Sequence, residues 1–125
     1  MSTFGTGLVE GGNLVANADL SAKQFFAVKQ TTTARKVDVA STGGEAITGI
    51  LQNTPKAGEA VEVCYAGYTK ALAGTGGFTA GDPLQTETVT GKLITKTSTN
   101  TIVAVAIETC AAGEIGLVRV LASAG

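Results

Sequence analysis

The feature that most constrains the fold of this chain is a tripeptide, Ala-Gly followed by an acidic residue, that occurs three times. It stands at 57–59, 80–82 and 112–114, and each copy precedes a run of residues typical of an extended strand. Glycine at such a position supplies a positive φ where a turn requires one. The pattern therefore predicts tight corners between short strands, and the unequal spacing argues against a repeat array.

The most informative segment, 49–72, reads GILQNTPKAGEAVEVCYAGYTKAL. Pro55 has a fixed φ and no amide donor, so no central strand can continue through it. Residues 61–65 then alternate two valines and a tyrosine with Glu and Cys, which predicts a half-buried strand. At Ala66-Gly67 the pattern is interrupted. A bulge or bend is favoured there over a hairpin, because alanine is a poor first residue for a primed turn.

Other segments also have the short, β-rich character of strands. Phe25-Phe26 would place one ring on each face, which predicts a strand buried on both sides. Gly49, inside a strand pattern, suggests close approach of another backbone. These expected strands are Phe25–Lys29, Lys36–Ala40, Ala46–Leu51, Lys92–Lys96, Ile102–Ile107 and Gly116–Leu121. Together with the corners they predict an all-β, Gly/Thr-rich barrel or sandwich of about eight to ten short strands.

Length and charge set limits on the class of protein. A chain of 125 residues is expected to form one domain with a core of its own. Nine basic and ten acidic residues give a net charge of −1 and no basic stripe, so nucleic acid is not an expected partner. The longest apolar run, 102–107, is too short to cross a bilayer, and no signal peptide is visible at the N-terminus. We therefore expect no membrane partner.

The N-terminal stretch differs from the rest of the chain. Residues 1–18 are rich in Gly and small residues and show no clear period, whereas 19–125 reads as a single β domain. The stretch nevertheless carries several large apolar residues, which a solvated tail would not need: Phe4, Leu8, Val9 and Leu14. Two interpretations remain open. One is an extended arm ordered by a neighbouring subunit or surface, and the other is a floppy terminus.

No group of residues forms a convincing reactive site. The sequence has no His, which removes the usual base for nucleophilic catalysis. Glu59 and Glu62 are more simply solvated rim residues than a carboxylate pair for glycoside hydrolysis. Cys64 and Cys110 lie in or beside apolar strands and are predicted to be buried free thiols, although a disulfide stays open. We expect no enzyme activity, no catalytic residues, no cofactor and no metal site.

Several segments, in this order, resemble the capsid decoration (cement) proteins of tailed bacteriophages. They are DLSAKQFFAVK, GILQNTPKAGEAVEVCYAGYTKALAG, TAGDPLQT and VAVAIETCAAGEIGLVRVL, which together span most of 19–121. The most specific part is 49–74, with its Gln-Asn-Thr-Pro-x-Ala-Gly-Glu turn and the strand that follows it.

This resemblance implies a structural virion protein, made in the bacterial cytoplasm and assembled on the outer surface of an icosahedral head. Its implied partner is the major capsid protein, whose lattice it would stabilise, and its implied state is a homotrimer. The residues expected to contact the capsid or a neighbouring protomer are Phe4, Leu8, Val9, Leu14, Tyr65, Tyr68 and Arg119. The alternative is a carbohydrate- or host-surface-binding module of a phage head or tail, for which Tyr65, Tyr68 and Phe78 are the candidate aromatic residues.

Overall fold

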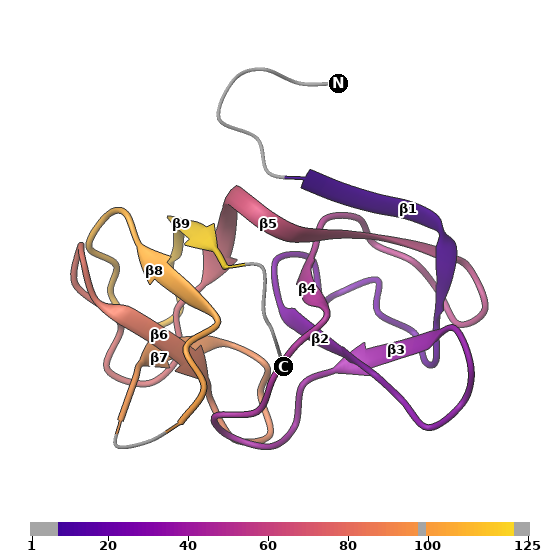
Figure 1. Cartoon of the computed structure of the whole chain (residues 1–125), viewed down its shortest axis with the longest axis horizontal. Helices are drawn as coiled ribbons and strands as arrows, with labels where there is room; N and C mark the ends of the chain where they lie inside the picture. The colour runs from indigo at the N-terminus through magenta and orange to yellow at the C-terminus, as the bar shows by residue number, and fades with distance from the viewer. Residues whose placement is uncertain (1–7, 98–99, 122–125) are drawn as a thin grey trace.

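The computed structural model describes residues 8–97 and 100–121, with the backbone alone for 8–12 (Figure 1). All regular structure in this part of the chain is β, which confirms the predicted all-β class. The strands are β1 (Leu8–Ala16), β2 (Ala27–Gln30), β3 (Lys36–Val39), β4 (Gly49–Leu51), β5 (Ala60–Leu72), β6 (Pro83–Thr86), β7 (Leu93–Thr95), β8 (Ala104–Ala106) and β9 (Ile115–Val120).

The strands form two halves that share β5. In the N-terminal half the order is β1-β3-β2-β4-β5, and β1 also pairs with β5, so five strands close into a barrel. In the C-terminal half the order continues β5-β9-β8-β6-β7. There, Leu93 of β7 forms a bridge to Ala73, directly after β5. Figure 1 shows β5 running across the top of the molecule from one half to the other.

The shared strand bends where the sequence predicted an interruption. Up to Ala66, β5 pairs with β1 and β4. From Gly67 onward it pairs with β9. Gly67 has a φ of 94°, a conformation that glycine adopts without steric cost. The prediction of a bend rather than a hairpin at Ala66-Gly67 is therefore confirmed. At this bend β5 leaves the N-terminal half and continues into the C-terminal half.

Strands at the junction of the halves are buried on both faces. Neighbouring residues of β2, β4 and β5 enter different cores, as the two-residue period of a strand requires. The first core, inside the barrel, contains Ala16, Leu20, Val28, Val37, Leu51, Val61 and Val63. The second, larger core contains Ala27, Ala40, Ile50, Cys64, Ala71, Ala73, Phe78, Leu84, Leu93, Val103, Ala104, Ala106, Cys110, Val118 and Val120. The two cores are thus separated by single strands.

The prediction for Phe25 and Phe26 is wrong in its register. β2 begins at Ala27, and Phe25 precedes it with a φ of 71°. Its ring packs against the larger core while Phe26 is buried, with the Lys23 ammonium 4.8 Å from the centre of the Phe26 ring. Burial on both faces does occur, but at Ala27 and Val28. Local propensity placed the strand two residues early because the aromatic residues supply core contacts from the preceding turn.

The three predicted corners share one hydrogen-bonding pattern. Gly58, Gly81 and Gly113 have φ values of 81°, 91° and 83°. In each corner the acidic residue donates its amide to the carbonyl three residues earlier. Its carboxylate accepts a hydrogen bond from the amide of that same residue, at 2.7 Å for Glu59, 2.9 Å for Asp82 and 3.0 Å for Glu114. Each turn is therefore closed by two hydrogen bonds between the same two residues, one to the carbonyl and one from the amide of the first residue.

A fourth corner of the same construction lies at Thr42-Gly43-Gly44-Glu45. Gly44 has a φ of 75°, and the Glu45 carboxylate accepts from the Thr42 amide at 2.7 Å. The Ala-Gly-acid pattern does not include this corner, because Gly43 stands where that tripeptide has alanine. Only the glycine with positive φ and the acid after it are needed for the geometry.

Close approach at Gly49 is confirmed. A Cβ at this position would meet the backbone carbonyl of Cys64 and the side chain of Val63. β4 therefore lies against β5 at a distance that only glycine allows. The sequence expectation for residues 1–18 takes a different form in the structure: residues 8–16 form β1, which pairs with β5 and β3 of the same chain.

Candidate functional site

The outward surface of β5, β9 and β8 is the candidate site, and we call it the outer face. Buried and exposed residues alternate along these strands, so every second side chain leaves the core. From the bend onward β5 contributes three residues, β9 three and β8 one, and Ile107 follows directly after β8. The outer face comprises Tyr68, Lys70, Leu72, Val105, Ile107, Ile115, Leu117 and Arg119.

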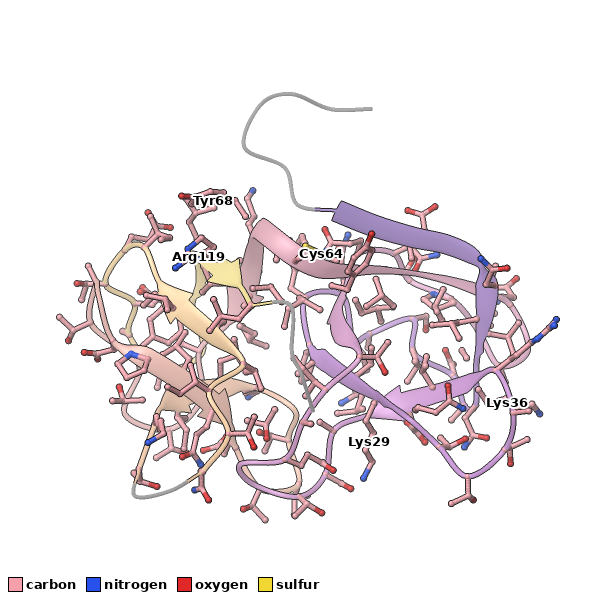
Figure 2. The ribbon with its side chains drawn as sticks, in the orientation of Figure 1. Lys29, Lys36, Cys64, Tyr68 and Arg119 are labelled. Atoms are coloured by element: carbon pink, nitrogen blue, oxygen red, sulfur yellow. The ribbon has the colours of Figure 1, made fainter. Side chains whose placement is uncertain are left out.

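The register sets these residues in rows across the three strands. Tyr68 is the partner of Arg119, and Arg119 is the partner of Val105. Figure 2 shows Tyr68 and Arg119 lying together at one end of the molecule. In the second row Lys70 is paired with Leu117, whose carbonyl accepts the Ile107 amide at 3.0 Å. The cations and apolar side chains are therefore interleaved rather than separated.

Apolar exposure is concentrated here. Six large apolar residues are exposed in the described part of the chain, and three of them, Tyr68, Ile107 and Ile115, belong to the outer face. Ile115 is 51% exposed. Single exposed apolar residues are normal on any surface, whereas large contiguous apolar patches mark interaction sites. Because three of the six lie on one face of a sheet, the outer face is the candidate contact site.

The polar ends on the outer face have no partners within the described residues. Neither Lys70 nor Arg119 makes an ion pair there, and the ion pair found in that part of the chain joins Lys29 to Glu45 at 3.5 Å. No acidic residue occurs in 67–72, 104–106 or 115–120. Glu108 lies beyond β8, and its carboxylate accepts the Leu117 amide at 2.8 Å. The two cations therefore face solvent without a carboxylate opposite them.

The structure brings together only part of the predicted contact set. Tyr68 and Arg119 are cross-strand partners, and Tyr65, 43% exposed, stands before the bend. Leu14 packs against the barrel core. Of the remaining predicted contacts, Phe4 lies outside the described residues, and the backbones of Leu8 and Val9 pair with Ala66 and Cys64.

Sequence reasoning missed most of the outer face. Lys70, Leu72, Val105, Ile107, Ile115 and Leu117 were not singled out. Their alternation with buried neighbours was a usable signal, but it became informative only once the strand order was known. Phe78, an aromatic candidate for glycan binding, is 3% exposed and belongs to the larger core. It has no face available for stacking on a sugar.

A second candidate site is a hollow on the N-terminal half, between β2, β3 and the fourth corner. Its lining includes Lys29, Asp38, Ser41, Glu45 and Val89. The Lys29 ammonium is 2.8 Å from the Ser41 hydroxyl and ion-paired to Glu45, so the central charges satisfy each other. Val89 is 73% exposed at a φ of 73°, an unfavourable conformation for a β-branched residue. Opposite charges already compensated within the chain make this hollow a weaker site than the outer face.

Both cysteines are buried free thiols, as predicted. Burial raises the pKa of the Cys64 thiol, and burial together with Glu114 and Glu108 raises that of Cys110. Both are therefore protonated and poorly reactive near neutral pH. Among residues 8–97 and 100–121 no cluster of potential metal ligands is found, and no helix there could cross a membrane.

Comparison with known proteins identifies a shared fold. No protein-family model matches the sequence, and no curated protein does. Among solved structures, the chain is similar to the "head fiber gp8.5 N base" of bacteriophage phi29. The TM-score is 0.68 at 17% sequence identity, over 93% of this chain and 97% of that one. At this identity the similarity concerns the fold, and the chain shares nearly its whole architecture with a base domain from a phage head fibre.

Proposed function

We propose that this chain is a structural component of a bacteriophage head. The observation that carries the proposal is the shared fold, which covers 93% of this chain and comes from the base of a phage head fibre. The proposed role is structural rather than catalytic. Corners held by paired hydrogen bonds and two apolar cores suit a protein whose task is to persist and to bind.

More specifically, we propose that it decorates the outer surface of the capsid and stabilises the lattice of the major capsid protein. The sequence resemblance to cement proteins supports this role, and it also supports a homotrimeric state. A protein that binds only the assembled lattice stabilises that lattice by mass action. Three linked copies would raise the effective concentration at neighbouring capsid subunits.

Binding to heads tests this proposal. Purified protein is mixed with expanded, DNA-free heads of its phage that lack the protein, and bound protein is separated by sedimentation. We expect saturation at a fixed ratio to capsid subunits, with unexpanded shells as the comparison. Heads that bind the protein should also withstand heat or chelation longer than bare heads. A protein that sediments with neither form of shell is not a decoration protein.

Binding to a carbohydrate or host surface remains the alternative, and exposed Tyr65 and Tyr68 are the observation in its favour. Such aromatic residues can stack on sugar rings. Tyr65 and Tyr68, however, stand one on each side of the bend in β5, so together they offer only a small surface for a sugar. Binding to host cells in the absence of heads, lost in Tyr65→Ala and Tyr68→Ala, would favour this alternative over the capsid role.

A further inference from the structure

We propose that the outer face docks on an acidic protein surface with an apolar centre. Within the function proposed above, on which this inference rests, that surface belongs to the capsid. The sequence resemblance gave no face and no partner chemistry. The register and charge of β5, β9 and β8 indicate both.

Charge is the first argument. Lys70 and Arg119 lie in adjacent rows of the same face, in strand segments that contain no carboxylate. Among the described residues, an ion pair joins half-buried Lys29, on the N-terminal half, to an acid of the same chain. A partner that supplies carboxylates opposite both cations would gain charge-assisted hydrogen bonds, including a bidentate one to Arg119.

The apolar residues between the cations are the second argument. Ile107 lies in the row of Lys70, Leu72 and Ile115 form the next row, and Tyr68 lies beside Arg119. Tyrosine and arginine are the side chains that most often dominate protein interfaces. Apolar residues beside them exclude water and strengthen the charge pairs. The combination fits a protein surface rather than a phosphate backbone, which would leave Ile107 and Ile115 without apolar contacts.

Two-fold self-association through this face is disfavoured. A two-fold symmetric contact places the same patch of one copy against that of another. The positive charges of Lys70 and Arg119 would then approach their own copies with no carboxylate between them. Like charges brought together in an interface cost free energy. A different protein with an acidic surface is the better partner.

The test is a pair of matched charge reversals in the head-binding experiment. Lys70→Glu/Arg119→Glu alters the outer face, and Arg35→Glu/Lys36→Glu makes the same change in net charge on the N-terminal half, where Figure 2 shows Lys36 at the far side from Arg119. We expect the first variant to bind expanded heads at least about tenfold more weakly and the second to bind as wild type. Binding of the wild type should weaken as NaCl is raised. Ile115→Ser should also weaken binding, with the salt dependence unchanged.

Each outcome separates the two proposals. Wild-type binding with no loss in the outer-face variant would overturn the docking inference and leave the head role standing. No wild-type binding would overturn both. If the outer-face reversal instead changed the oligomeric state measured by sedimentation, the face would join copies of this chain, and the inference would be wrong. Circular dichroism and thermal unfolding confirm that each variant is folded.

Discussion

The two halves of this molecule close their sheets and fill their cores differently. The N-terminal half is a barrel closed by pairing of β1 with β5, around seven buried residues of which six are Val or Leu. The C-terminal half closes through one bridge between Ala73 and Leu93. Its core has fifteen buried residues, six of them alanines, and it draws Ala27, Ile50 and Cys64 from strands of the barrel.

This difference shows how a small β protein can combine a closed core with a sheet face left open. The barrel is self-contained, whereas the second core uses small residues that let sheets pack closely and leaves an open outer face on β5, β9 and β8. The larger core packs against the outside of the barrel through Ala27, Ile50 and Cys64. We therefore expect the two halves to unfold as one cooperative unit. The proposed docking surface would then be presented on a rigid support.

Truncating one large residue in each core is the strongest test of that unity. Leu51 belongs to the barrel core and Leu84 to the larger core, and both are fully buried. We expect Leu51→Ala and Leu84→Ala each to lower the free energy of unfolding by about 3 kcal/mol, since each leaves a cavity. Both should still unfold in one transition in urea, followed by circular dichroism and tyrosine fluorescence. Two transitions, with only one of them shifted by Leu51→Ala, would show that the halves are independent.

Adding a methyl group to a glycine of each half should distinguish their packing. A Cβ on Gly49 would meet the Cys64 carbonyl, whereas one on Gly116 would meet the Cys110 sulfur. Because backbone cannot give way as a side chain can, we expect Gly49→Ala to cost about 3 kcal/mol and Gly116→Ala about 1 kcal/mol. Thermal unfolding measures both. Adding Cys110→Ala should rescue the Gly116 variant, and equal losses at the two glycines would contradict this account.

The corners of the two halves, in contrast, should be equivalent. Nothing lies within 4 Å of a Cβ built on Gly58 or Gly113, so the cost of alanine arises from its positive φ alone. We expect Gly58→Ala and Gly113→Ala to lose about 1 kcal/mol each in urea unfolding. Asparagine, which tolerates this conformation, should cost less at both positions. A large difference between the two corners would mean that one also has a tertiary role.

The smallest expected effect concerns acid stability of the C-terminal half. Glu87 accepts hydrogen bonds from the Thr75 amide at 3.0 Å and the Thr90 hydroxyl at 2.7 Å, and these hold its pKa below the ordinary value of 4.5. A lowered pKa stabilises the fold above 4.5, and this contribution is lost as the pH falls through the folded-state value. Glu87→Gln should cost about 1 kcal/mol at neutral pH and progressively less in acid. An identical loss at every pH would assign the effect to packing.

Much of the fold could be predicted because its signals are local. The corners at 57–59, 80–82 and 112–114 require glycine for a positive φ and an acid to hold the turn, and both needs are visible in the sequence. Gly49 and the bend at Ala66-Gly67 were predicted for the same reason. The start of β2 was misplaced because the rings of Phe25 and Phe26 fit a strand pattern as well as a packed turn.

The candidate site was harder to predict than the fold. Tyr68 and Arg119 were named separately, and nothing in 68–72 or 115–120 shows that these two segments pair. Residues 43 or more positions apart meet only through register, which depends on both cores being filled at once. Lys70, Ile107 and Ile115 look like ordinary surface residues until the sheet places them in the same row or in neighbouring ones.

By itself, then, the sequence determined the class of the fold, the places where the chain turns and the residues that turn it. Those properties depend on φ preferences and two-residue alternation, which act over a few positions. Only the tertiary structure decided the strand order, the sharing of β5 between two cores and the meeting of Tyr68 with Arg119. Pairing between distant strands is selected by burial of the whole core rather than by any local preference, and for that reason the outer face exists only in the folded chain.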